Sequence, residues 1–137
     1  MAIIEELIRE DARGTLSFGN YMLAHKSKVS DFEHNGDLYK VKTFKEITKL
    51  ERNGLFVYES VPGTAVEGLS LSENGIEFTV EGNEDAQITL ELEPEKEYTV
   101  IMNDVNMGTM KTNLGGKLVL SVELEEPESV KVKVVQL

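Results

Sequence analysis

Hydrophobic and polar residues alternate along much of the second half of the chain, with the period of two that is typical of β-strands. Four runs place apolar side chains on one face and mostly charged or hydroxyl side chains on the other. The apolar positions are Ile76, Phe78 and Val80; Ile88, Leu90 and Leu92; Leu118, Leu120, Val122 and Leu124; and Val130, Val132 and Val134, with Val119 an exception on the polar face. Turn signals recur every ~8–12 residues. The pattern predicts a single all-β domain over residues 1–137, an antiparallel β-sandwich of the jelly-roll or Ig-like kind.

Asn-Gly pairs between strand-like runs predict tight hairpins, because a type I′ turn needs positive φ at both central residues. The three pairs are Asn35-Gly36, Asn53-Gly54 and Asn74-Gly75. Around the first turn, the expected cross-strand partners are Phe32 with Tyr39, Glu33 with Leu38 and Asp31 with Lys40. A further hairpin is expected around "NDVN" (residues 103–106) and a turn at Gly115-Gly116.

The hairpin around Asn53-Gly54 carries apolar residues on both of its predicted faces. Its expected partners are Leu50 with Val57, Glu51 with Phe56 and Lys49 with Tyr58. Alternation then places Phe56 and Tyr58 opposite Leu55 and Val57. A half-exposed sheet would have polar groups on one of these faces, so this strand predicts a contact surface.

The N-terminal segment "IIEELI" brings its apolar residues to one side as either a short helix or a leading strand, and the sequence does not decide between them. Charge is unevenly distributed. Residues 1–58 carry as many bases as acids, so the whole net charge of −11 comes from residues 59–137. Two copies could therefore meet with complementary charge.

Composition excludes several classes of function. The chain has no cysteine, hence no disulfide, thiolate metal site or Cys nucleophile. No apolar run approaches the roughly 20 residues that span a bilayer, and the N-terminus lacks the pattern of a signal peptide. An acidic chain repels phosphate backbones and anionic lipid. We therefore expect a cytoplasmic protein that binds neither nucleic acid nor membrane.

Candidate catalytic and metal-binding groups do not form a recognisable set. His34 lies between Glu33 and Asp37 at a hairpin tip, where a solvated polar turn is expected, with a divalent-cation site on these three residues as the alternative. Glu81, Glu84 and Asp85 lack the frame of a calcium-binding loop and are expected to form a solvated acidic turn, with Ca²⁺ binding as the alternative. The sequence predicts no catalytic residue, no cofactor and no metal site.

Two stretches carry a resemblance to known proteins. With "GTLSFGNYMLAHKSKVSDFEHNGDLYKVKTFKEITKLERNGLFVYESVPGTAVEG" and "GTMKTNLGGKLVLSVEL", the chain resembles a family of small bacterial proteins, some of them labelled "endosialidase". Sialidases clamp their substrate with an arginine triad and carry repeated Asp-box turns. This chain has only Arg9, Arg13 and Arg52 and no Asp box, so sialidase activity is not expected. The segment "IMNDVNMGTMKTNLGGKLVLSVEL" also resembles, more loosely, accessory sandwich domains of polysaccharide-active enzymes.

The leading functional hypothesis is a non-catalytic β-sandwich that forms a closed homo-oligomer or serves as a binding scaffold. The alternative is a carbohydrate-binding or glycoside-processing accessory module, and a basic protein is a further candidate partner. The predicted binding or interface residues are Tyr21, Tyr39, Phe56 and Tyr58. The carbohydrate hypothesis requires these aromatic side chains to lie together on one exposed face.

Overall fold

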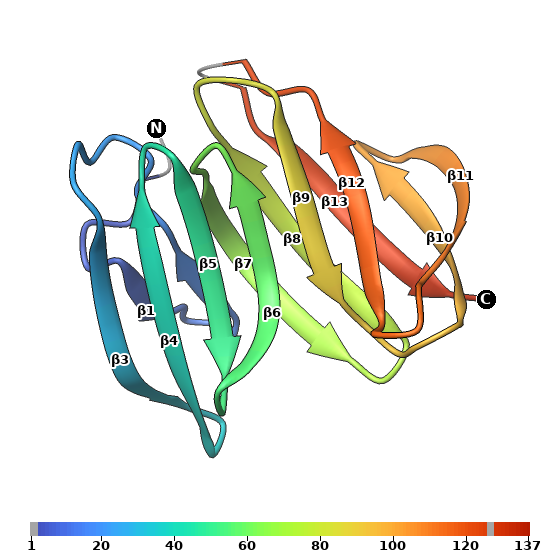
Figure 1. Cartoon of the computed structure of the whole chain (residues 1–137), viewed down its shortest axis with the longest axis horizontal. Helices are drawn as coiled ribbons and strands as arrows, with labels where there is room; N and C mark the ends of the chain where they lie inside the picture. The colour runs from blue at the N-terminus through green and yellow to red at the C-terminus, as the bar shows by residue number, and fades with distance from the viewer. Residues whose placement is uncertain (1–2, 126–127) are drawn as a thin grey trace.

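The computed structural model describes residues 3–125 and 128–137, which form two antiparallel sheets packed face to face (Figure 1). The seven-stranded sheet A has the order β1 (Ile8–Glu10), β2 (Leu16–Phe18), β7 (Ala65–Ser72), β8 (Gly75–Glu81), β13 (Val130–Gln136), β10 (Glu97–Met102) and β11 (Val105–Lys111). The six-stranded sheet B has the order β12 (Lys117–Val122), β9 (Ala86–Glu91), β6 (Leu55–Val61), β5 (Ile47–Arg52), β4 (Asp37–Phe44) and β3 (Ser27–His34). The predicted all-β sandwich is confirmed. The segment "IIEELI" forms neither of its two expected elements: residues 3–7 are turn or irregular, and only Ile8 lies in a strand, β1. No helix occurs within the described ranges.

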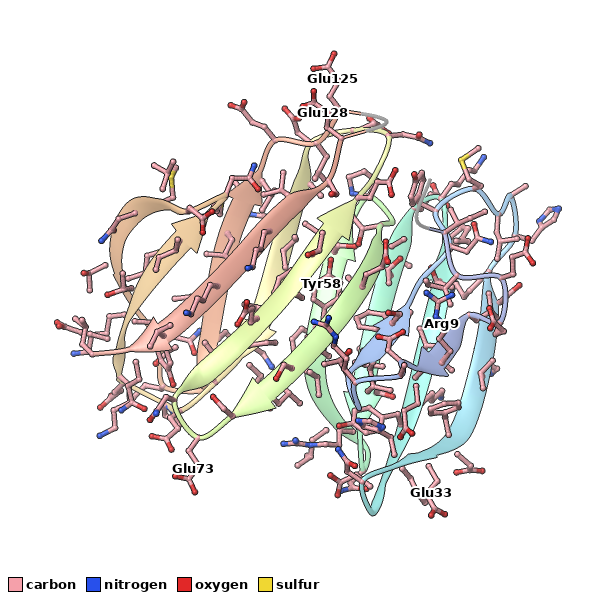
Figure 2. The ribbon with its side chains drawn as sticks, turned by 180° about the vertical axis from the view of Figure 1, so that it is seen from behind. Arg9, Glu33, Tyr58, Glu73, Glu125 and Glu128 are labelled. Carbon is pink, nitrogen blue, oxygen red and sulfur yellow. The ribbon has the colours of Figure 1, made fainter. Side chains whose placement is uncertain are left out.

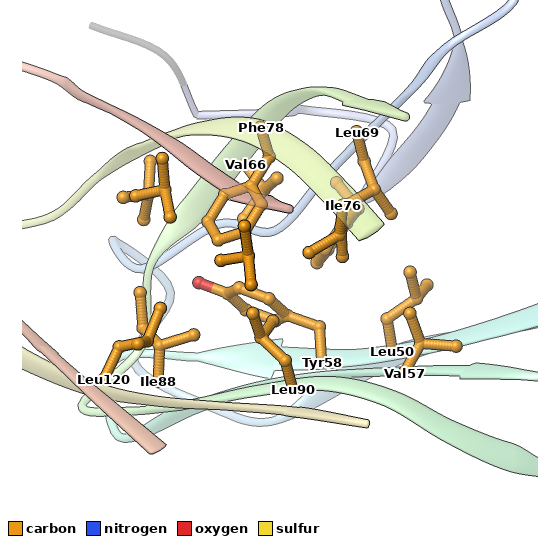
Figure 3. Close-up of a cluster of buried hydrophobic side chains, with 14 of the residues drawn as sticks. Leu50, Val57, Tyr58, Val66, Leu69, Ile76, Phe78, Ile88, Leu90 and Leu120 are labelled. Atoms are coloured by element: carbon orange, nitrogen blue, oxygen red, sulfur yellow. The ribbon is translucent and has the colours of Figure 1, made fainter. Parts of the chain in front are cut away.

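The alternating runs form the core as their period predicts. Of the apolar positions singled out above, only Leu92 and Val130 are not fully buried, and Val119 is 42% exposed on the outer face of sheet B. Tyr58 lies at the centre of the core (Figure 3). Its ring meets Phe18 and Phe78 edge-on, at centroid distances of 5.3 and 5.6 Å. Such edge-to-face contacts add about 0.5–1.5 kcal/mol each to the burial of the rings.

Two of the three Asn-Gly turns form as predicted. Asn35 and Gly36 have φ of 49° and 82°, and Asn53 and Gly54 have φ of 52° and 79°. The third prediction is wrong: Ser72 pairs with Gly75, so the turn residues are Glu73 and Asn74. Gly75 is instead a strand residue where a Cβ would collide with the carbonyl oxygen of Val134. The "NDVN" hairpin also forms, with Met102 paired to Val105.

Bulges change the register of two hairpins away from their turns. Phe32 pairs with Tyr39 and Glu33 with Leu38 as predicted, but the pairing is then interrupted, and Asp31 (φ 57°) has no partner on β4. The expected pair of Asp31 with Lys40 is therefore wrong.

In the next hairpin Glu51 pairs with Phe56 as predicted, but Leu50 pairs with Tyr58. Val57 is the extra residue of a β-bulge, which lets Val57 and Tyr58 both point into the core. The expected pairs of Leu50 with Val57 and of Lys49 with Tyr58 are wrong for this reason, as is the placement of Tyr58 on the outer face.

A chain of buried hydroxyl groups connects sheet B to the segment that leads into sheet A. The Tyr58 and Ser60 hydroxyls each lie 2.7 Å from the Thr64 hydroxyl. The Thr48 hydroxyl donates to the Thr64 carbonyl (2.8 Å) and accepts from the Thr64 N–H (3.0 Å). Because its single proton is used there, Thr43 must donate to Thr48, at 2.8 Å, and Thr43 accepts from the Asn20 N–H. All of these hydroxyl-bearing residues are fully buried, so each bond avoids the cost of an unsatisfied polar group.

The turn at Gly54 can be tested by replacing this glycine with alanine, which adds one methyl group. The space around its Cβ position is empty, so Gly54→Ala should destabilise through left-handed backbone strain alone, by about 1–2 kcal/mol. Gly115→Ala is the matched control, since that glycine does not need a positive φ and has only one contact, at 3.5 Å. Denaturant unfolding measures both. Equal stability of the two variants would contradict the assigned turn.

The hydroxyl chain can be tested at its branch point. Thr64→Val leaves buried hydroxyls of Tyr58 and Ser60 without their partner, which should lower the free energy of unfolding by at least about 2 kcal/mol. Thr89→Val, on the outer face of sheet B, should change it by less than about 0.5 kcal/mol. A Thr64→Val variant as stable as the control would show that the chain of hydroxyls does not contribute to stability.

Candidate functional site

The four aromatic residues predicted as a binding surface do not share an exposed face. Tyr21, Tyr39 and Tyr58 are 2%, 4% and 0% exposed, and Tyr58 lies inside the sandwich, between the sheets (Figure 2). Phe56 is the remaining residue, half-buried on the outer face of sheet B. The expectation of an exposed aromatic platform built from these four side chains is therefore wrong.

Phe56 itself is covered by cations rather than left open. The Lys117 ammonium lies 4.0 Å from the ring centroid, and that of Lys49 lies 5.9 Å away. Lys117 is held there by Glu91, with Nζ 2.5 Å from Oε1. A cation over an aromatic face is stabilising, and here it occupies the surface on which a sugar ring would stack.

Two adjoining clefts lie at the end of the sandwich where the β3–β4, β5–β6 and β7–β8 turns meet. The larger, of about 580 Å³, is lined by residues including Arg52, Phe56, Glu73 and Glu93. The smaller, of about 270 Å³, includes His34 and Tyr39, and Arg52 borders both. Burial raises the pKa of Tyr39, and the neighbouring Arg52 guanidinium partly offsets this rise. Acids and one guanidinium line the larger cleft, but the ion pair of its lining residue Glu91, with Lys117, lies on the outer face of sheet B.

His34 differs from the solvated turn residue that the sequence suggested. It is 6% exposed, with Nδ1 2.5 Å from Oε1 of Glu10 and its ring 5.8 Å from that of Tyr39. Glu10 belongs to β1, at the edge of sheet A, so this contact joins the two sheets across one side of the sandwich. The predicted solvation is wrong because β1 lies beside the tip of β3, a long-range contact that sequence spacing does not reveal.

Carboxylates and histidines elsewhere do not gather into a metal site. Within residues 3–125 and 128–137, no group of three His, Asp or Glu side chains is placed to hold an ion. Glu81 is 3% exposed and so does not belong to a solvated turn. Asp85 accepts a hydrogen bond from the Leu124 N–H, at 3.0 Å. The same described residues contain no helix long and apolar enough to cross a bilayer.

The other notable region is the side of the sandwich where sheet A extends one strand beyond sheet B. On β10 the inward residues Tyr98 and Val100 are buried, at 1% and 2% exposure. On the next strand, β11, every residue is exposed, including Met107 at 60%. Figure 1 shows β11 at the right, beyond the last strand of sheet B. Sheet B therefore covers sheet A only as far as β10.

The neighbouring edge of sheet B is regular and available for pairing. β12 pairs with β9 without a register shift. The Gly116 carbonyl accepts a hydrogen bond from the Leu92 N–H, on the side of β12 that faces β9. The N–H and carbonyl of Lys117 are instead bonded to Asn113, on the opposite side of the strand. Because main-chain groups alternate in direction along a strand, those of Val119 and Ser121 point away from β9. Among the described strands, none pairs with that edge.

Exposed apolar side chains accompany these two free edges. We call the free edges of β11 and β12 and their side chains the open end of the sandwich; its exposed apolar residues are Val105 (59%), Met107 (60%), Met110 (38%) and Val119 (42%). On the opposite side both edge strands are protected, because β1 has only three residues and β3 is interrupted by the bulge at Asp31. At the open end β11 is also bulged, at Met107, but β12 is regular. In the sequence, the apolar Val119 on a polar face was the one visible signal of the open end.

Comparisons with known proteins find no relative. No protein-family model, no curated protein and no solved structure matches the chain.

The buried Tyr58 phenol predicts a loss of stability at alkaline pH. Burial raises the pKa of Tyr58 far above its ordinary value near 10, and its bonds to Thr64 and Ser60 offset only part of the rise. Above pH ~10 the unfolded chain releases this proton while the folded chain keeps it, so stability falls by up to about 1.4 kcal/mol per pH unit for this group.

Tyr58→Phe should therefore show a shallower decline of unfolding free energy above pH ~10 than the wild type. Phe78→Leu, which loosens the same cluster but keeps the phenol, should retain the wild-type slope. Identical slopes for all three proteins would contradict the raised pKa.

Proposed function

We propose that the chain is a non-catalytic β-sandwich scaffold that works in the cytoplasm by self-association through its open end. The single observation that carries this proposal is the step between the sheets, which leaves β11 uncovered and the outer edge of β12 without a partner strand among the described residues. Natural sheets usually protect such edges with charges, bulges or covering loops. β12 has no bulge and no charged residue after Lys117.

Charge at the open end favours association of this acidic chain with itself. Neither β11 nor β12 contains an acidic residue, although the net charge is −11. Glu33 and Glu73 lie at one end of the strands and Glu125 and Glu128 at the other (Figure 2). These four carboxylates lie away from the free edges, and since neither edge strand carries an acid, two copies could approach edge to edge with less repulsion than the net charge suggests.

This interface replaces the one expected from Phe56 and Tyr58. The two-faced strand from which that expectation came is a bulged strand whose Tyr58 belongs to the core. Homo-oligomerisation remains our prediction, with the contact moved from the outer face of β6 to the free edges of β11 and β12. A carbohydrate-binding role has less support, because the aromatic side chains that would provide a platform are buried or covered by Lys117.

Light scattering coupled to size exclusion tests the proposal. The wild type should have the mass of an oligomer at micromolar concentration. Met107→Asp should shift it toward the monomer, because a carboxylate would then be buried in the contact. Leu55→Asp is the matched control: it places the same charge at an apolar residue that is 68% exposed at a hairpin tip, and the mass should not change. A monomeric wild type would refute self-association.

A further inference from the structure

We propose that two copies join at their open ends in a stepped dimer, in which β11 of each copy pairs with β12 of the other. The proposal rests on the self-association proposed above and specifies its partner, symmetry and register. Each layer would then continue from one copy into the next, sheet A of one copy in line with sheet B of the second. The two-fold axis lies between the layers and runs parallel to the strands.

The step between the sheets decides which two-fold arrangement fits. Sheet A extends one strand beyond the cover of sheet B. If the axis were perpendicular to the sheets, β12 would meet β12 of the second copy and the two protruding β11 strands would occupy the same space. Rotation about an axis parallel to the strands exchanges the layers, so the protruding strand of each copy enters the space that the other leaves open. The contact is isologous and closes as a dimer.

Strand direction is consistent with this arrangement. β11 and β12 are joined by the short connection 112–116 and therefore run in opposite directions. A rotation about an axis parallel to the strands preserves direction. β12 of the second copy is consequently antiparallel to β11, which is the orientation that allows a regular ladder next to the antiparallel β10–β11 and β9–β12 pairs.

The register follows from hydrogen bonds within one copy. Asn113 N–H donates to the Lys117 carbonyl, at 3.2 Å, so these residues lie at the same height along the strands. Counting two residues at a time from this pair places Lys111 level with Val119 and Thr109 level with Ser121. Rotation about the strand direction preserves height, so these become the cross-dimer neighbours.

The main-chain groups at these positions are suited to pairing. Thr112 N–H donates to the Lys96 carbonyl, which turns Thr112, and by alternation Met110, toward β10. The groups of Thr109 and Lys111 therefore face the free edge of β11, as those of Val119 and Ser121 face the free edge of β12. If β12 were shifted by two residues, Lys111 would pair with Lys117 instead of Val119. That pairing would need the N–H and carbonyl of Lys117, which are already bonded to Asn113, and would place two lysines side by side.

The same arrangement covers the exposed apolar side chains of β11. In the dimer the layer above β11 is β11 of the second copy, so the two inner faces meet. Met110 pairs with the buried Tyr98 and Val105 with Met102, which places both on the inward face, and Met107 is the extra residue of the bulge between them. Methionine side chains adapt to such irregular contacts.

Single cysteines test the register, because the protein has none of its own. Thr109→Cys and Ser121→Cys are prepared separately, each with its main-chain pairing intact. In the stepped dimer these two positions are directly opposed across the contact, with Cα atoms about 5.5 Å apart. The equimolar mixture should be joined by dibromobimane, a short thiol crosslinker, while each variant alone should not.

The expected excess of crosslinked dimer in the mixture is on the order of a hundredfold, since opposed thiols react at millimolar effective concentration whereas free protein chains collide at about ten micromolar. Lys111→Cys mixed with Val119→Cys is a second pair of the same register, in case one variant folds poorly. Ser30→Cys, on the opposite edge strand β3, is the collision control and should crosslink with none of them.

The other outcomes overturn the proposal in distinguishable ways. Crosslinking of Ser121→Cys or Val119→Cys alone would indicate pairing of β12 with β12, and crosslinking of Thr109→Cys alone would indicate pairing of β11 with β11. An oligomeric mass without any of these crosslinks would refute the stepped dimer and leave self-association standing. A monomeric mass for wild type and variants would refute both.

Discussion

The buried hydrogen bond between Tyr58 and Thr64 is the interaction on which the arrangement of the sheets depends. A phenol at the centre of the core is stable only with a partner, and Thr64 supplies it at 2.7 Å. Thr64 is in turn fixed through its main chain by Thr48 of β5, immediately before the chain enters sheet A at Ala65. One set of hydroxyls thereby holds three strands of sheet B and the connection to sheet A in a single relative position. Apolar contacts alone are less directional and would allow several relative positions.

The same requirement explains the bulge in β6. Regular pairing after Asn53-Gly54 would turn both Tyr58 and Ser60 away from the core and leave Thr64 without either hydroxyl. The extra residue at Val57 restores the inward direction and places a second apolar side chain beside it. The lost ladder bond is offset by burial of a large aromatic ring between Phe18 and Phe78 and by a satisfied hydroxyl. Tertiary packing thus overrides the register that the turn alone would set.

Local features of the sequence were sufficient to predict the fold class but not the candidate site. Period-two alternation identified the core faces of β8, β9, β12 and β13, and two Asn-Gly turns gave the first pairs of their hairpins, because these depend on neighbouring residues only. The position of a bulge depends on packing against the opposite sheet, which local sequence does not reveal, so the predicted face of Tyr58 was wrong. The burial of His34 depends on Glu10, which approaches from the other sheet. The free edge of β12 depends on strand order, which alternation does not encode; only the apolar Val119 on a polar face indicated it.

An odd number of strands has a physical consequence that packing within one copy does not remove. Thirteen strands among the described residues cannot be shared equally between two layers, so one strand must lack a partner above it. Here that strand is β11, and its exposed methionines lie next to an edge of sheet B that retains unpaired main-chain groups. Such a surface is complementary to a second copy of itself that is rotated by half a turn about an axis parallel to the strands. The strand that protrudes from sheet A of one copy then lies in the space beside sheet B of the other copy. In the stepped dimer that we propose, the same contact would complete both the backbone pairing and the apolar burial, which would account for the occurrence of the two features together on one side of the sandwich.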